Sequence, residues 1–261
     1  YLVEDAADLE KLADASIGEV YRLENDIAVS RSFKTIGSFK GILNGNGKKI
    51  TGIDMLVTIT YDNTLTKSVE GQLFGTIEKN AVVYGLTVES PKFSNLFTDI
   101  PKGHSDYYWY GMGLFCNTNN GVIDSVTING ANISLVARKN NVNGNIYGAK
   151  YFGVVAKENN GKILNSYIDG TLKTPDANNI AGIVHLNRGT VANIRSKLNM
   201  DLADWSGYSS PDARAFSLGV SENRGKVYNI WTEGDITKST WTIKSGSEFN
   251  GYICAYSYEG A

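Results

Sequence analysis

The chain has 261 residues, of which 42% are hydrophobic and 20% are charged, so it is long enough to bury a sizeable core and is not expected to be disordered. Its formal net charge of −2 offers no basic surface for a phosphate backbone, and no stretch approaches the roughly 18 consecutive apolar residues of a membrane-spanning helix. Nucleic acid and a membrane span are therefore not expected. The 28 glycines, 15 tyrosines and only 4 prolines predict many short strands joined by tight turns.

The first predicted element is a short amphipathic helix within DAADLEKLAD, residues 5–14. Asp5 is a candidate N-cap, and Leu9, Leu12 and Ala13 recur at helical spacing behind it. A helix of this kind would cover the open end of the first coil in a stacked repeat structure.

After this helix the chain repeats one phrase: an apolar run, then Asn or Gly, then an alternating strand. The phrase reads GVVAKENNGKILNSYIDG at residues 153–170, and related copies begin at residues 71, 113, 182 and 218. Each copy has an anchor residue at its turn, spaced by 40, 40, 28, 36 and 35 residues: Ala81, Gly121, Gly161, Gly189, Gly225 and Gly260. This period is typical of a solenoid, in which each repeat is too small to close a core alone.

Residues at fixed distances from the anchors are predicted to form columns that run from coil to coil. Two positions after the first five anchors lies a β-branched column: Val83, Ile123, Ile163, Val191 and Val227. Four positions after them lie Gly85, Ser125, Asn165, Asn193 and Asn229, and the three asparagines predict a ladder of side-chain hydrogen bonds from coil to coil. The Asn-Asn-Gly at 159–161 is interpreted as a turn. We therefore predict an all-β chain: a right-handed parallel β-helix over residues 20–261, preceded by a capping segment over residues 1–19.

Four insertions between the repeat strands carry many of the aromatic residues. They span 93–111, 134–153, 200–216 and 237–250, all at one phase of the repeat, and insertions at one phase emerge on one face. Exposed aromatic rings stack on sugars or anchor protein partners; the alternative is that these rings fold back over the solenoid. The candidate ligand-binding residues are Tyr107, Tyr108, Trp109, Tyr110, Trp205, Tyr208 and Trp241.

The two cysteines fall at matching positions of the repeat. Cys116 and Cys254 lie about four coils apart, or about 19 Å, whereas a disulfide needs Cα atoms within about 7 Å. Two free, buried thiols are expected. His185 is aligned with Cys116, Ala156 and Cys254, which predicts a structural side chain beside the core.

The end of the chain repeats only the first half of the phrase. Residues 250–261 read NGYICAYSYEGA, and no strand follows the last anchor. An open solenoid end exposes apolar columns and unpaired strand edges. We therefore expect this chain to be part of a longer polypeptide.

Three phrases in the first third of the chain resemble a family of bacterial surface proteins. VYRLENDIAV at 20–29, FKGILNGNGKKITGI at 39–53 and LFGTIEKNAVVYGLTV at 73–88 look like the opening of proteins that carry GLUG-type repeats. They are also similar to the region preceding the catalytic domain of streptococcal IgA-cleaving zinc metalloproteases. The resemblance implies a secreted or surface-anchored β-helical segment and no single activity.

Zinc peptidase chemistry is excluded by the histidines. The sequence has only His104 and His185 and no H-E-x-x-H motif, whereas a zinc peptidase needs two histidines one helical turn apart with a glutamate base between them. We expect no metal site and no cofactor.

The carboxylates do not form an evident catalytic cluster. Asp124, Asp169 and Asp235 follow their anchors by 3, 8 and 10 residues, so they do not superpose as in β-helical pectin-degrading enzymes. Glu24 and Asp26 are interpreted as a solvated turn rather than as a calcium site. No catalytic residue is therefore predicted.

These observations predict a non-catalytic bacterial module at the cell surface or outside the cell. It would act as an adhesin-like module or a spacer, and a glycan or a host protein would bind its loop face. The alternative is a polysaccharide lyase or glycoside hydrolase of the β-helix type, which an activity screen on acidic polysaccharides with and without calcium would distinguish.

Overall fold

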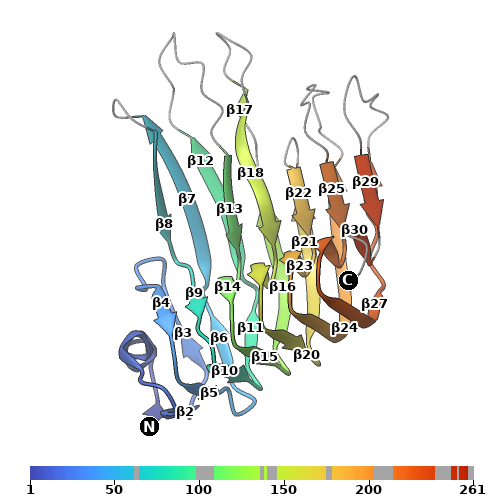
Figure 1. The fold of residues 1–261 in the computed structure, drawn as a ribbon. Helices are drawn as coiled ribbons and strands as arrows, with labels where there is room; N and C mark the ends of the chain where they lie inside the picture. The colour runs from blue at the N-terminus through green and yellow to red at the C-terminus, as the bar shows by residue number, and fades with distance from the viewer. Residues whose placement is uncertain are drawn as a thin grey trace.

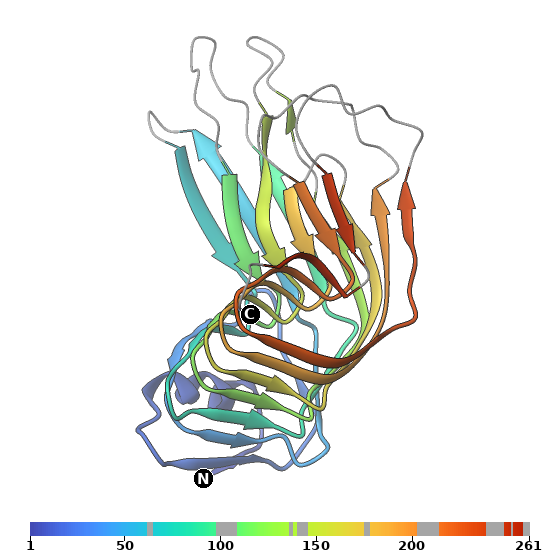
Figure 2. The same ribbon diagram turned by 45° about the vertical axis from the view of Figure 1, so that its right-hand side comes forward.

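The computed structural model describes residues 1–61, 65–97, 109–135, 138–139, 146–174, 178–202, 214–238, 248–251 and 253–257. Over these residues the chain winds into a parallel β-helix whose coils stack along one axis, from the N-terminal end to the C-terminal end (Figures 1 and 2). This confirms the predicted all-β solenoid with a short helix at its start. None of the described helices has the length and hydropathy to span a bilayer.

The N-terminal helix forms as predicted, but one of its predicted buried residues is exposed. α1 (Ala6–Glu10) is followed directly by a 3₁₀ turn (Lys11–Asp14), and the Asp5 carboxylate accepts a hydrogen bond from the Asp8 amide at 2.9 Å. Leu9 and Leu12 are fully buried, but Ala13 is exposed and Ala15 is buried in its place. A 3₁₀ turn has three residues per turn, so the buried positions recur every third residue.

One sheet contains a strand from each coil. Its seven strands run in coil order: β4 (Ile36–Phe39), β9 (Phe74–Ile77), β14 (Cys116–Asn119), β19 (Ala156–Asn159), β23 (Val184–Asn187), β26 (Val220–Asn223) and β30 (Cys254–Ser257). The ring of Phe74 lies 5.7 Å from that of Phe39 and 5.4 Å from that of Phe115, between ring centroids. Aromatic packing therefore fills the core of the first coils.

The largest described sheet has two rows, which meet at a bend. The first row comprises β1 (Leu2–Val3), β2 (Val20–Leu23), β5 (Ile42–Asn44), β10 (Val82–Tyr84), β15 (Val122–Asp124), β20 (Lys162–Leu164) and the starts of β24 (Thr190–Leu202) and β27 (Lys226–Thr232). The second row comprises β3 (Ile27–Ala28), β6 (Lys49–Thr51), β7 (Asp54–Tyr61), β11 (Thr87–Glu89), β12 (Lys92–Phe97), β16 (Thr127–Ser134), β21 (Tyr167–Lys173), the rest of β24 and β27, and β28 (Ile236–Lys238). β8 (Leu65–Glu70) pairs with β7 in the antiparallel direction.

A third sheet forms at the ends of the predicted insertions. It comprises β13 (Trp109–Gly113), β18 (Ile146–Gly153), β22 (Asn178–Ala181), β25 (Arg214–Ser217) and β29 (Glu248–Gly251), with β17 (Arg138–Lys139) antiparallel to β18. Its strands rise alongside the second row (Figure 1). Phe93 of β12 and Phe152 of β18 meet edge to face at 5.2 Å, so this sheet encloses core.

The predicted β-branched column is confirmed. In the strand register Val83 pairs with Ile123, then Ile163, Val191 and Val227 follow in successive coils. The first four are fully buried, while Val227 is partly buried. The anchors therefore set the correct register.

The predicted asparagine ladder is also confirmed, and it lies at the bend between the two rows. Asn193 donates a side-chain hydrogen bond to Asn165 at 2.8 Å, and Asn229 donates to Asn193 at 3.0 Å. The residues at this bend all have φ between 49° and 63°: Gly85, Ser125, Asn165, Asn193 and Asn229. Asparagine tolerates this left-handed conformation better than most residues, so it serves both the bend and the ladder.

A second ladder, which the sequence did not predict, is buried. Asn119 donates to Asn159, Asn159 to Asn187 and Asn187 to Asn223, each at 2.8 Å between the amide nitrogen and the amide oxygen. Each of these three also donates to a backbone carbonyl of the next coil. The Asn-Asn-Gly at 159–161 is a turn as expected, but Asn159 is its buried member and Asn160 is exposed.

No disulfide joins Cys116 and Cys254, as predicted. Cys116 and Cys254 lie in one register column, with Ala156, Val184 and Val220 between them. Cys116 is fully buried, and burial raises the pKa of its thiol well above the usual range. Cys254 is only half-buried, so the expectation of two buried thiols is wrong for this residue.

The predicted alignment of His185 is wrong by one residue. Val184, not His185, occupies the column of Cys116 and Ala156. The copy GIVHLNRG has one residue fewer before its anchor than GVVAKENNG. In the structure, residues that lie the same number of positions before the two anchors are paired. His185 therefore lies on the outer side of the sheet, where it is nevertheless 5% exposed.

The burial of His185 predicts acid sensitivity. Burial lowers its pKa from 6.5 to about 3, with Lys157, Arg188 and Lys150 adding to the effect and Glu158 opposing it. The unfolded chain binds the proton below about pH 6.5, so stability present above that pH is lost as the pH falls toward 3, by about 2 kcal/mol at pH 5. Urea unfolding at about pH 7.5 and 5 should show this extra loss in the native protein and not in His185→Gln; equal losses would contradict it.

Candidate functional site

The aromatic residues predicted as a binding face are largely outside the described structure. Tyr107, Tyr108, Trp205, Tyr208 and Trp241 lie outside the described residues. The other two, Trp109 and Tyr110, begin β13, where they pair with Gly148 and Ala149 of β18. That these rings gather on one face stays a prediction.

The fourth tryptophan, Trp231, was not among the residues predicted from the sequence, and its side chain is strongly exposed on the solenoid wall. Trp231 lies on β27 and is 69% exposed. Its register column contains Tyr167 and Arg195 in the two preceding coils. All three stand six positions after their anchors, so the repeat register could have predicted that they form one column.

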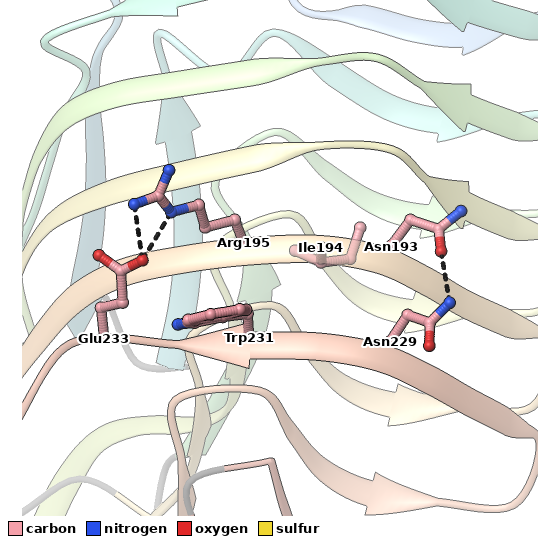
Figure 3. A pocket seen from close by; sticks show the side chains of 6 residues that line it. All are labelled: Asn193, Ile194, Arg195, Asn229, Trp231 and Glu233. Carbon is pink, nitrogen blue, oxygen red and sulfur yellow. Dashed lines mark hydrogen bonds and ion pairs between the residues drawn. The ribbon is translucent and has the colours of Figure 1, made fainter.

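Trp231 forms one wall of a shallow groove (Figure 3), here called the Trp231 groove. The groove has a volume of about 400 Å³ and is lined by Asn193, Ile194, Arg195, Asn229, Trp231 and Glu233. Ile194 is 1% exposed and forms an apolar floor. The indole lies between the Arg195–Glu233 pair on one side and the Asn193–Asn229 pair on the other (Figure 3).

Ion pairs hold the charged side of the groove in place. The Arg195 Nε and Nη2 atoms both lie 2.7 Å from Glu233 Oε1, and the Lys197 Nζ lies 3.1 Å from Glu233 Oε2. Hydrogen bonding by Arg195, then by Lys197, lowers the pKa of Glu233, and the pKa of Arg195 is raised in turn. Glu233 is therefore ionised at neutral pH and can accept hydrogen bonds, but it is a poor general acid.

Four of the carboxylates considered as catalytic residues or calcium ligands make hydrogen bonds or ion pairs within the solenoid. Asp124 Oδ1 accepts a hydrogen bond from Asn165 at 2.9 Å, and Asp169 Oδ1 accepts one from the Gly130 amide at 3.0 Å. Glu24 is ion-paired with Arg22, and Asp26 accepts a hydrogen bond from the Lys49 amide. Within the part of the chain that the structure describes, no three His, Cys, Asp or Glu side chains gather to hold a metal ion.

Comparison with known proteins supports the fold. No protein-family model and no curated protein matches the chain. A solved structure does match: that of a "putative immunoglobulin A1 protease" from Bacteroides ovatus, with a TM-score of 0.54 and 12% sequence identity over 99% of this chain and 84% of that one. At this identity the likeness shows a related fold alone, and the resemblance to GLUG-type repeats and to streptococcal proteases stays an expectation from the sequence.

Proposed function

We propose that this chain is a non-catalytic module of a cell-surface or secreted bacterial protein and that it binds carbohydrate in the Trp231 groove. The observation that carries the proposal is the indole itself: a large apolar ring, 69% exposed, with hydrogen-bonding side chains on both sides. Aromatic rings present an apolar face for stacking, and neighbouring polar groups fix the orientation of a ligand.

The groove is built to bind a polar ligand without first rearranging. Arg195 and Glu233 are already held by their ion pair, and the asparagines by their ladder, so few rotamers remain to be ordered when a ligand binds. The Trp231 groove is lined by hydrogen-bond donors of Arg195 and Asn229 and by the acceptor oxygens of Glu233. A sugar has the same combination of hydroxyl groups and an apolar ring face.

Trp231 is exposed because its side chain points away from the core. Arg195 precedes it in the same column and has a coil on each side, yet its side chain is still 55% exposed. Side chains of this column therefore point away from the core, and stacking of coils leaves them open to solvent.

Two other functions are tested by the same experiments. A host protein could use the same exposed indole as an anchor, and a β-helical lyase or hydrolase would cleave what it binds. Against catalysis stands the ionised, doubly paired Glu233, because no second acid lines the groove among the residues that the structure describes. Cleavage of an acidic polysaccharide that a chelator abolishes would overturn the proposal of a non-catalytic module.

Trp231→Ala is expected to weaken glycan binding about fivefold to thirtyfold, because stacking on an exposed ring contributes about 1–2 kcal/mol. Its melting temperature should stay unchanged, since the ring contributes little to the core. The measurement is a mixed glycan array followed by calorimetric titration of the best ligand.

The matched control is Tyr228→Ala. Tyr228 lies on the same strand, is 51% exposed and stands outside the groove, so its loss should leave binding unchanged. Equal binding by Trp231→Ala and the native protein would refute the proposed site, as would an equal loss in both variants.

A further inference from the structure

The column of outward side chains that contains Trp231 continues into the two preceding coils. In strand register Tyr167 pairs with Arg195, and Arg195 pairs with Trp231. Tyr167 is half-buried and does not line the Trp231 groove. Neighbouring coils lie about 4.8 Å apart, so the column runs about 10 Å along the solenoid axis from one aromatic residue to the other. The column is therefore longer than the groove.

A second column, beside the first, carries charges of both signs. Asp169 pairs with Lys197 in strand register, and the Lys197 Nζ atom lies 3.1 Å from Glu233 Oε2. Glu233 is also held by Arg195 from the first column. The Asp169 Oδ2 atom accepts a hydrogen bond from the Tyr167 hydroxyl at 3.1 Å. Two cations and two carboxylates thus lie together on this surface, and their charges cancel.

The outer asparagine ladder runs along the other side of the Trp231 column (Figure 3). Asn229 donates to Asn193, Asn193 donates to Asn165, and Asn165 donates to Asp124 at 2.9 Å. All three asparagines are exposed. A side-chain amide has two N–H groups; the ladder uses one of them, and the described residues supply no acceptor for the other. One spare donor therefore recurs in each coil beside the column.

The three columns, from the coil of Tyr167 to the coil of Trp231, form a surface here called the axial strip. Its donors recur at the coil spacing of about 4.8 Å, which is close to the length of one residue in an extended β-1,4-linked glycan. Its two aromatic rings lie two coils apart, so they match the first and third residues of such a chain. A glycan that coils tightly would not follow both rings.

The balance of charge on the axial strip favours a neutral ligand. Arg195 and Lys197 already share the carboxylate of Glu233, so an anionic sugar would compete with that carboxylate for them. It would also lie beside Glu233 and Asp169, and like charges placed together weaken binding. A neutral glycan meets no such repulsion, because its hydroxyl groups donate to carboxylates and accept from amides.

We propose that the Trp231 groove is one part of a longer site, in which the axial strip binds a neutral, extended polysaccharide along the solenoid axis. This inference rests on the proposed function, since Trp231 holds a sugar residue in both. It adds that the ligand is uncharged, that it follows the axis and that Tyr167 holds a further residue two coils away. The column continues beyond Tyr167 with Thr127 and Thr87, which have no ring for stacking.

Glycans of different length test the extent of the site. The probes are the disaccharides and tetrasaccharides of β-1,4-linked glucose and of β-1,4-linked mannose, titrated calorimetrically into the full chain. In at least one series we expect the tetrasaccharide to bind at least tenfold more tightly than the disaccharide. A gain of about threefold or less, which the extra registers of a longer chain supply, would overturn the axial site, as would failure of both series to bind. If no glycan of any kind bound, the proposed function would fail as well.

Tyr167→Thr separates the two ends of the site. Threonine occupies this column in the two preceding coils, so the fold accepts it, and an unchanged melting temperature will check this. We expect at least fivefold weaker binding of the tetrasaccharide and unchanged binding of the disaccharide, whereas Trp231→Ala should weaken both. Equal tetrasaccharide binding by Tyr167→Thr and the native protein would refute the axial site while leaving the Trp231 groove in place.

The matched control is Tyr84→Thr. Tyr84 is also a half-buried tyrosine of the solenoid wall, but it lies on β10 in the first row, away from the axial strip. Its replacement should leave the binding of both glycans unchanged. A loss of tetrasaccharide binding equal to that of Tyr167→Thr would show an unspecific effect and refute the axial site.

The uronate forms of the same chains test the preference for a neutral ligand. Tetrasaccharides of β-1,4-linked glucuronate and mannuronate have the linkage of the neutral probes and add one carboxylate to each residue. At about 0.15 M salt we expect each to bind at least fivefold more weakly than its neutral counterpart. Equal or tighter binding of the uronate chain would overturn the assignment of the axial strip to neutral polysaccharide.

Discussion

Replacement of Ile163 by aspartate is expected to destabilise the protein by about 4 kcal/mol, because it buries a charge without a partner in the middle of the aliphatic column. Ile163 is fully buried and pairs with Ile123 in one coil and Val191 in the next. Both neighbours are apolar, so neither can solvate a carboxylate. Urea unfolding followed by circular dichroism measures the loss.

The control for this variant is the adjacent residue. Lys162 is exposed and lies on the same strand, so Lys162→Asp should change the free energy of unfolding by less than about 0.5 kcal/mol. If Ile163→Asp were as stable as Lys162→Asp, the register of the column would be wrong.

Asn159→Leu is expected to cost about 3 kcal/mol, because it interrupts the buried ladder at an inner member. The Asn159 amide accepts from Asn119 and donates to Asn187 and to the Thr190 carbonyl. Leucine has a similar shape but no polar atoms, so the neighbouring amides lose partners in a place that water does not reach.

The neighbouring Asn160 is the matched control for the ladder. It is exposed and makes a side-chain hydrogen bond of 2.9 Å to Asn120, and water replaces that bond when it is lost. Asn160→Ala should therefore cost less than about 0.5 kcal/mol. Similar losses in the two variants, measured by urea unfolding, would show that burial of the ladder contributes little.

Asn159 and its neighbour Asn160 differ in a way that the repeat pattern does not predict. Asn159 and Asn160 are adjacent and of the same type, yet one lies in the core and the other in solvent. Which one turns inward depends on how the backbone rounds the corner between two sheets. The repeat showed that a turn occurs there, and it did not show its direction.

The candidate sites depended still more on the folded chain. Trp231 lies in a strand of the repeat, but only its column with Tyr167 and Arg195 showed that its side chain is on the outer surface. His185 was misplaced by one residue because its copy is one residue short before the anchor.

The repeat pattern is enough to predict the solenoid, the Ile163 column and the Asn193 ladder. Stacked coils place equivalent residues in contact, so the same residue type recurs at the same offset and a linear pattern reports a spatial one. The packing of the coils settles which polar side chains are buried, where the third sheet closes the core and which rings lie beside charged groups. These features depend on corners and bulges, where the backbone direction is set by contacts between coils rather than by the residues of one coil.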